Sequence, residues 1–245
     1  MMTAGTLYLI PVSLAPIEWE AYLPPDVRAR TLSLDYFVVE SAKTARSELK
    51  HIGYQKQLRD IIIETLPDKP SSKDLDRLLR PVVKGQDCGL MSEAGCPAVA
   101  DPGALLVNAA HGIGVRVVPL VGPSSILLAL MASGLNGQSF AFIGYLPIAD
   151  SARDASIRRL ERESRQRGFT QIFIETPYRN TRLFASILAS CQPDTQLCVA
   201  SSISGPTESV VTRTVSEWRL APHPEIGKQA TVFLLQAGRS AQTHL

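Results

Sequence analysis

The sequence lacks most of the devices by which enzymes commonly hold nucleotides, metal ions or a catalytic histidine. No glycine occurs in residues 11–15, the loop that follows the first apolar run, and no GxxxxGK[ST] segment occurs anywhere. Glycine-rich loops allow bare backbone N–H groups to meet a pyrophosphate, so their absence argues against NAD, FAD or ATP held in that way. No Ser–His–Asp order, HExxH segment or kinase signature is present, and the histidines stand apart from every candidate loop, at His51, His111, His223 and His244.

Cysteine is scarce, and no long apolar run is present. The four cysteines form no CxxC pair and have no histidine at ligand spacing, which argues against zinc and against a disulfide framework. We therefore expect no metal, and free thiols in a reducing compartment. The longest strongly apolar run, residues 126–132, is far shorter than a membrane span, and the N-terminus does not resemble a secretory signal. These features predict a soluble, cytoplasmic protein without a membrane segment.

Charge of one sign is not in large excess either. The chain has 25 Lys and Arg against 23 Asp and Glu, a net charge of +2. Such a mild balance does not indicate a protein that coats phosphate backbones, although it allows a local basic patch. Hydrophobic residues make up 45% of the chain, which is enough for a core, and 245 residues fit one large domain or two of ordinary size.

Apolar runs typical of strands alternate with helical patterns, which predicts an α/β protein with parallel sheet. Residues 208–215 alternate polar and apolar side chains as half-exposed antiparallel strands do, so we expect the second half to hold a mixed sheet. The segment Leu120–Pro123 predicts a boundary between an N-terminal α/β domain, residues 1–120, and a C-terminal α/β domain, residues 121–245. The expected strands are 6–12, 36–40, 61–64, 88–91, 115–120, 139–145, 170–175, 196–201, 208–215 and 229–236; the expected helices are 44–54, 73–83, 102–112, 125–133, 152–167 and 178–190.

The loop from Ser92 to Gly103, SEAGCPAVADPG, is the most informative stretch of the chain. It follows a buried-strand pattern and leads into a helix, which we expect Asp101 to cap with Pro102 at the first helical position. Gly95 allows close approach of the backbone to a ligand, and open α/β sheets bind ligands at such strand ends. A strand–loop–helix junction without any ligand is the alternative interpretation.

Three further loops follow strand patterns in the same way: residues 11–15, 121–125 and 175–180. Ser124 and Ser125 open a helix, where hydroxyls can hold a carboxylate or a ribose, although plain capping by Ser124 is the ordinary explanation. Arg179 lies near a helix start, where the helix dipole disfavours a cation, so a functional role gains credibility over a plain surface arginine.

Arginines gather in the helical segment 152–167, with Glu161 and Glu163 between them. A solvated, ion-paired face is the ordinary interpretation, and binding of an acidic partner is the alternative. The arginines are Arg158, Arg159, Arg162, Arg165 and Arg167.

Taken together, the loops resemble those of the tetrapyrrole methylase superfamily of S-adenosylmethionine-dependent methyltransferases. The resemblance runs from Gly5 to about Gly238 and is greatest to the branch that includes the small-subunit ribosomal RNA 2′-O-ribose methyltransferases. The segments that carry it are GTLYLIPV, SEAGCPAVADPG, VRVVPLVGPSSILLAL, FAFIGYLP and IFIETPYRN.

This resemblance implies two α/β domains with S-adenosylmethionine in the cleft between them, and usually a homodimer. The family holds its methyl donor mainly through backbone groups of the loops, which agrees with the missing glycine-rich motifs. Carried onto this chain, the donor-binding residues are Pro11, Val12, Ser13, Ser92, Glu93, Ala94, Gly95, Cys96, Pro97, Gly122, Ser124 and Ser125, with Glu175, Thr176, Ala230 and Thr231 completing the pocket.

A hydroxyl acceptor needs a base or charge stabilisation as it loses its proton. We expect Glu93 and Arg179 to be catalytic, the latter as an electrostatic anchor; Glu40 and Lys43 are further candidates for the base.

Two loops depart from the ribosomal RNA branch. That branch generally has Thr-Pro-Ile-Gly-Asn after the first strand and an acid-Asp-Thr-Arg cluster after the second, where this chain has residues 12–16 (VSLAP) and 40–43 (ESAK). Three functions therefore stay open: a methyltransferase acting on an RNA ribose 2′-hydroxyl or an unidentified acceptor, a methyltransferase for a tetrapyrrole-like small molecule, and a non-catalytic protein that binds S-adenosylmethionine.

Overall fold

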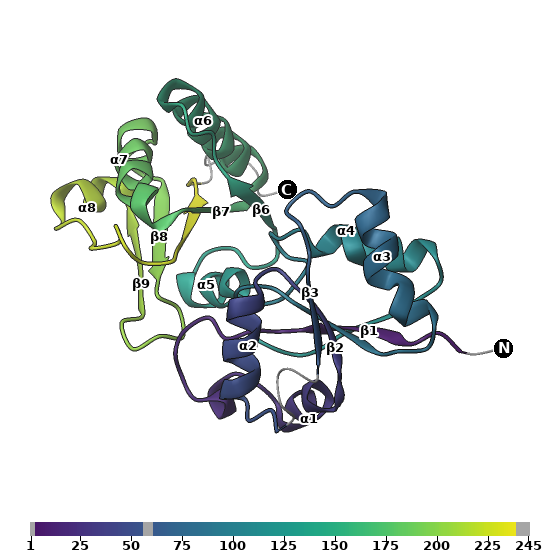
Figure 1. The fold of residues 1–245 in the computed structure, drawn as a ribbon. Coiled ribbons are helices and arrows are strands. Elements are labelled where there is room, and N and C mark those ends of the chain that lie inside the picture. The colour runs from purple at the N-terminus through teal and green to yellow at the C-terminus, as the bar shows by residue number, and fades with distance from the viewer. Residues whose placement is uncertain (1–2, 56–60, 239–245) are drawn as a thin grey trace. The chain divides into compact units, whose positions relative to one another are not determined.

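The structure is a computed structural model that describes residues 3–55 and 61–238 (Figure 1). The chain divides into two compact units, one ending at Ser124 and the other beginning at Ser125. No helix among the described residues is long and apolar enough to cross a membrane.

Unit 1 contains a parallel sheet of five strands in the order β3-β2-β4-β1-β5. The carboxyl ends of all five strands therefore lie at one edge of the sheet, where the connecting loops begin. The strands are β1 (Thr6–Ile10), β2 (Tyr36–Val39), β3 (Ile62–Thr65), β4 (Cys88–Met91) and β5 (Arg116–Pro119).

Helices cover both faces of this sheet because alternate strand residues point to opposite sides. Leu7 of β1 belongs to one core with residues of α3 (Ser72–Val83) and α4 (Gly103–Gly112). Ile10 belongs to the other core, with residues of α1 (Pro25–Ser33) and α2 (Ala42–His51). A short 3₁₀ helix, η1 (Trp19–Ala21), precedes α1.

Unit 2 contains a mixed sheet in the order β6-β7-β10-β8-β9. β6 and β7 are parallel, whereas β10 runs antiparallel to both of its neighbours and β9 runs antiparallel to β8. The strands are β6 (Phe140–Tyr145), β7 (Thr170–Glu175), β8 (Gln196–Ser201), β9 (Ser209–Thr214) and β10 (Thr231–Gln236).

The core of unit 2 forms where α6, α7 and α8 pack on one face of the sheet around Phe173 and Phe233. α6 and α7 lie side by side (Figure 1), and α5 contacts β8, β9 and β10. The helices of this unit are α5 (Ser125–Ser133), α6 (Asp150–Arg167), the 3₁₀ helix η2 (Pro177–Arg179), α7 (Asn180–Ser190) and α8 (Val215–Leu220). The expected α/β class, with a parallel first sheet and a mixed second sheet, is confirmed.

Several local expectations need correction. α4 begins at Gly103 rather than Pro102, and Gly114, not Gly112, takes the left-handed conformation after it. α1 and α8 were not expected from the pattern. α1 buries only Val27 and Thr31, so it has no apolar stripe. α8 is a short capped helix that begins at Val215, the last residue of the strand expected at 208–215.

The charged helix α6 is less solvated than expected. Arg159 pairs with Glu163 at 2.8 Å as an exposed helix face predicts, but Arg165 reaches Asp194 at 2.9 Å on another element. Glu161 is buried, where it accepts hydrogen bonds from the Gln192 N–H at 2.7 Å and from the Thr195 hydroxyl. Carboxylates therefore already engage part of this arginine cluster.

Gly89 makes close packing of the first sheet possible, which gives a stability test. A Cβ at Gly89 would lie 2.5 Å from Ile10 Cδ1 and 2.9 Å from Phe37 Cδ1. Gly89→Ala should lower the free energy of unfolding by about 1–3 kcal/mol through overpacking. Gly112→Ala meets nothing within 4 Å and should change it by no more than about 0.5 kcal/mol. Urea unfolding followed by circular dichroism measures both, and equal effects would contradict this account.

Candidate functional site

The predicted ligand loops of unit 1 meet at the carboxyl edge of its sheet. β1 lies between β4 and β5, so the loops that follow these three strands begin side by side. Val12 and Gly95 form an isolated antiparallel bridge, in which each N–H donates to the other residue's carbonyl at 2.9 Å. This pair of hydrogen bonds joins the loop after β1 to the loop after β4.

The loop after β5 joins the same cluster. A Cβ at Gly122 would lie 2.2 Å from the Pro11 ring, so only glycine permits this approach. The Cys96 thiol donates to the Pro123 carbonyl at 3.3 Å. We call residues 11–13, 92–97 and 122–124 the loop cluster. It contains every predicted donor-binding residue of unit 1; Ser125, also predicted, is the first residue of α5 in unit 2.

A tightly turned backbone follows in the loop after β4. The Ser92 hydroxyl donates to the carbonyls of Ala94 and Gly95 at 3.2 and 3.3 Å. Ala98 and Ala100 have positive φ angles of 67° and 64°, a conformation that costs a non-glycine residue about 1 kcal/mol. Such strain clusters at ligand sites in proteins, which favours a binding role for this loop over a plain junction.

Asp101 holds this turn together. Its Oδ1 accepts hydrogen bonds from the N–H groups of Ala98 at 3.0 Å and Gly103 at 2.6 Å. Asp101 therefore satisfies the first free N–H of α4 as expected, one residue later than the sequence pattern placed the helix start. Burial raises the pKa of its carboxyl, although the hydrogen bonds oppose that shift.

Glu40 connects the loop after β2 to the loop cluster. Its Oε2 accepts a hydrogen bond from the Glu93 N–H at 3.0 Å. Burial raises the pKa of Glu40, the hydrogen bond from the Glu93 N–H opposes that shift, and the carboxylates of Asp101, Glu93 and Asp68 add to it. This carboxylate fixes the backbone at the position from which the Glu93 side chain extends.

The side chains of Glu93 and Ala94 are exposed, whereas Ser92, Gly95 and Pro97 are buried. The loop cluster therefore presents one free carboxylate and an accessible segment of backbone. Lys43, a further candidate for the catalytic base, is exposed on α2 near this end of the sheet. The Ser41 hydroxyl caps the start of α2. Catalytic roles for Glu93 and Lys43 stay predictions.

Four predicted donor-binding residues of unit 2, all except Ser125, also come together. Thr231 of β10 pairs with Glu175 of β7 on one side and with Ser201 of β8 on the other. Beyond this row, the Ser202 N–H donates to the Ala230 carbonyl at 2.9 Å. Glu175, Thr176, Ala230 and Thr231 thus share one end of the mixed sheet.

Arg179 forms an ion pair within this group. Its Nε and Nη2 donate to Glu175 Oε1 at 2.9 and 2.7 Å, and the Thr176 N–H donates to the same oxygen at 2.7 Å. The Glu175 side chain is only 3% exposed, so Arg179 compensates a buried charge. This explains how a cation is tolerated at the start of α7; its role as an electrostatic anchor stays a prediction.

Two structural features near this end of the sheet were not predicted from the sequence. Asn180 is fully buried, and its amide donates to the carbonyls of Ile226 at 3.1 Å and Gln229 at 2.7 Å, which fixes the approach to β10. Ser202 and Ser204 have positive φ angles of 50° and 65°. The Ser-Gly-Pro turn at 204–206 was the available signal for that loop. Asn180 ends the predicted loop 175–180, but nothing local indicates its contacts with Ile226 and Gln229.

No group of three His, Cys, Asp or Glu side chains in residues 3–55 and 61–238 is arranged to hold a metal ion. In unit 1, backbone groups and the Glu93 carboxylate are what the loop cluster offers to a ligand.

Comparison with known proteins gives several sequence relatives, while no protein-family profile matches the chain. The ribosomal RNA small subunit methyltransferase I of Xylella fastidiosa is 32% identical over 179 residues, which cover 73% of this chain and 61% of the relative. That of Escherichia coli O157:H7 is 27% identical over 245 residues, covering 97% of this chain and 79% of the relative. The chain is similar in sequence to ribosomal RNA small subunit methyltransferase I proteins. The resemblance that the loops predict is therefore confirmed.

Solved structures agree with this relationship at the level of the fold. The methyltransferase CobJ superposes with a TM-score of 0.64 at 17% identity, covering 98% of this chain and 97% of CobJ. A conserved hypothetical protein from Aeropyrum pernix gives a TM-score of 0.66 at 17% identity.

The chain spans about three fifths of the Xylella methyltransferase I and about four fifths of that from Escherichia coli.

The position of Glu40 predicts a dependence of stability on pH. Because its pKa is raised above the ordinary 4.5, the folded chain binds this proton more tightly than the unfolded chain does. The stabilising contribution of protonated Glu40 is fully present below pH 4.5, the ordinary value. It is lost as pH rises through the raised pKa of the folded chain. Glu40→Gln removes the titration but keeps an oxygen that can accept from the Glu93 N–H.

The free energy of unfolding of Glu40→Gln, relative to the unsubstituted chain, should therefore increase as pH rises above 4.5 and through the raised pKa of Glu40. Denaturant titrations across this range measure the difference. Glu40→Ala is the matched control, since it also removes the hydrogen-bond acceptor and should be less stable than Glu40→Gln throughout. Curves that stay parallel for Glu40→Gln and the unsubstituted chain would refute the assigned titration.

Proposed function

We propose that this protein is an S-adenosylmethionine-dependent methyltransferase whose acceptor is a ribose 2′-hydroxyl of small-subunit ribosomal RNA. The observation that carries the proposal is the Val12–Gly95 bridge, which assembles the loop cluster at the strand ends where open α/β sheets bind ligands. The alignment with the methyltransferase I of Escherichia coli over 97% of this chain supports the activity and the acceptor.

The loop cluster suits a donor that carries no pyrophosphate. Its exposed backbone around Ala94 can bind an adenosine or a methionine group, and the Glu93 carboxylate can accept hydrogen bonds from ribose hydroxyls or an ammonium group. Gly95 and Gly122 keep the loops close together. In unit 2, Glu175, Thr176, Ala230 and Thr231 are proposed to add further donor contacts.

The bound donor supplies a methyl group on a sulfonium, which is a good leaving group. The chain itself has mainly to position the acceptor oxygen in line and to remove its proton. We assign proton acceptance to Glu93, whose backbone Glu40 fixes, and electrostatic anchoring of the acceptor to Arg179. The protein is proposed to work as a homodimer in the cytoplasm, where its thiols, all free among the described residues, stay reduced.

Titration calorimetry with S-adenosylmethionine and S-adenosylhomocysteine tests the donor site first. Saturable binding of both is expected, followed by transfer of a labelled methyl group to RNA of the small ribosomal subunit. Transfer to small molecules of a cell extract, and not to RNA, would favour the tetrapyrrole-like alternative. Binding without transfer to either would favour a non-catalytic binding protein, and absence of binding would refute the proposal.

Glu93→Ala tests the assigned base. Turnover should fall by about 10²- to 10⁴-fold, because proton removal is lost, while donor affinity falls far less, since backbone groups supply most donor contacts. Single-turnover methyl transfer and calorimetry measure the two effects. Glu20→Ala, an exposed acid on η1 outside the loop cluster, should leave both unchanged. Unaltered turnover in Glu93→Ala would exclude Glu93 as the base.

A further inference from the structure

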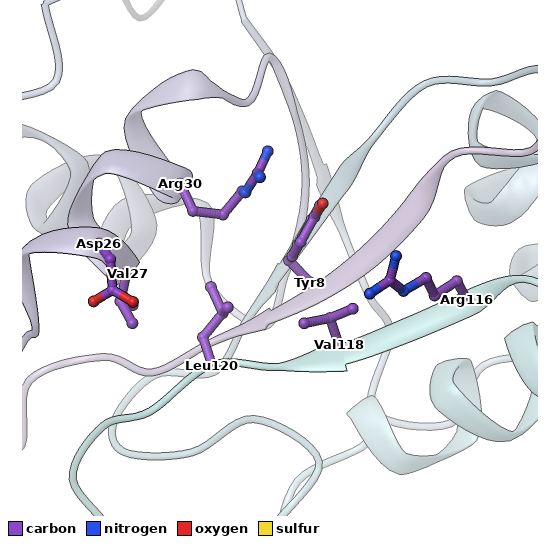
Figure 2. Close-up of a pocket in the computed structure, with 7 residues that line it drawn as sticks. All are labelled: Tyr8, Asp26, Val27, Arg30, Arg116, Val118 and Leu120. Atoms are coloured by element: carbon purple, nitrogen blue, oxygen red, sulfur yellow. The ribbon is translucent and has the colours of Figure 1, made fainter.

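Another candidate site in unit 1 includes Leu120, which lies two residues before Gly122 of the loop cluster. It is a cavity of about 370 Å³ between α1 and the β1–β5 side of the sheet. Figure 2 shows Arg30 and Asp26 reaching it from α1, and Tyr8 and Arg116 from the neighbouring strands. Pockets of this size hold small ligands in other proteins.

The cavity exists because β5 is an edge strand that α1 covers incompletely. Tyr8 and Val118 are register partners in β1 and β5, and both are partly exposed on the face of the sheet that α1 packs against. Val27 of α1 is buried beside them. The result is an apolar floor of Val27 and Val118 with an aromatic ring at its side.

Positive charge exceeds negative charge around this ring, because two arginines line the cavity against one carboxylate, Asp26 of α1. The Arg30 guanidinium is 4.9 Å from the Tyr8 ring centroid, and Figure 2 shows Arg116 on the other side of the ring. Within residues 3–55 and 61–238, neither guanidinium forms an ion pair. Arg159 and Arg165 of α6, in contrast, are paired with carboxylates.

The lining chemistry is therefore that of a nucleotide site. Guanidinium groups bind phosphate through paired N–H donors, and an aromatic or guanidinium plane stacks on a base. The Asp26 carboxylate, at the other end of the cavity in Figure 2, can accept hydrogen bonds from sugar hydroxyls or a base amino group. A plain anion would not need the apolar floor or the acid.

We infer that this cavity binds one nucleotide unit of the RNA acceptor, with its phosphate held by the Arg30 and Arg116 guanidinium groups and its base against the apolar floor of Val27 and Val118. This inference rests on the proposed function, because that function makes RNA the acceptor. RNA is recognised in proteins chiefly at single-stranded segments, whose bases can turn outward into such a pocket. A free nucleotide shares the same chemistry, and the experiment separates the two sources.

The test measures binding of a labelled single-stranded oligonucleotide of small-subunit ribosomal RNA by fluorescence anisotropy over a range of salt concentrations. Saturating S-adenosylhomocysteine is present, so that the loop cluster cannot contribute a nucleotide site. Arg30→Gln and Arg116→Gln should each weaken RNA binding about tenfold and reduce the slope of log K against log[salt] by about one.

Arg80→Gln is the matched control, because Arg80 is an exposed arginine of the same unit on α3, which packs on the opposite face of the sheet. It should change RNA affinity by less than about twofold. S-adenosylhomocysteine affinity should be unchanged in all three variants. The melting temperature should fall only in Arg30→Gln, by no more than about 4 °C, because the contact with Tyr8 is lost. Equal effects of Arg80→Gln and the two cavity variants would show a general charge effect and overturn the inference.

Cytidine 5′-monophosphate, titrated against the same complex, distinguishes the sources. If the monophosphate competes with RNA, and the competition is weaker in the two cavity variants, the result supports the site. Binding of the monophosphate without any binding of RNA would support the nucleotide chemistry and overturn RNA as its source. Methyl transfer to RNA is measured separately. If transfer occurs but the cavity variants bind RNA as tightly as the unsubstituted protein, only this inference is overturned. If RNA binding depends on the two arginines but no transfer occurs, only the proposed activity is overturned.

Discussion

The candidate site depends on one pair of backbone hydrogen bonds, those between Val12 and Gly95. Parallel strands bring their carboxyl ends to one edge, but they do not by themselves fix the loops that follow. The bridge joins the loops after β1 and β4 as a short stretch of sheet would, without requiring any particular side chain. Gly122 against Pro11 and the Cys96 thiol on the Pro123 carbonyl then fix the third loop. A ligand held here would meet backbone already ordered by the protein, and so would lose less free energy to ordering on binding.

Much of the fold could be predicted from the sequence, because burial and periodicity coincide in most elements. β4, β7, β8 and α5 begin and end at the predicted residues. α1 could not be found in this way, since it contributes two buried side chains and its stability comes from the sheet beneath it. α8 carried a readable signal in the capping box of Thr214 and Glu217, which the neighbouring strand pattern obscured.

The site was predictable at the level of loops and less so at the level of interactions. Glycines, small residues and strand ends marked the loop cluster, and the structure brings them together. The hydrogen bond from Glu93 to Glu40 joins residues 53 positions apart, and it depends on β2 lying beside β4, which no local pattern specifies. The same holds for Arg179, whose unfavourable helix position is explained only once the buried carboxylate of Glu175 is seen. These side chains were thus predicted from local chemistry, whereas the contacts that hold them were not, because those contacts depend on how distant segments pack.

The strand order of unit 2 has a consequence for how the chain is made. Unit 1 is complete when residue 124 has been synthesised, and every strand of its sheet is then present. In unit 2 the last strand, β10, lies in the middle of the sheet and separates β7 from β8. Until β10 leaves the ribosome, both of these strands have an open edge that can pair with other chains. The nascent protein therefore passes through a stage in which unit 1 is finished and unit 2 is aggregation-prone, and that stage ends only when β10 has emerged.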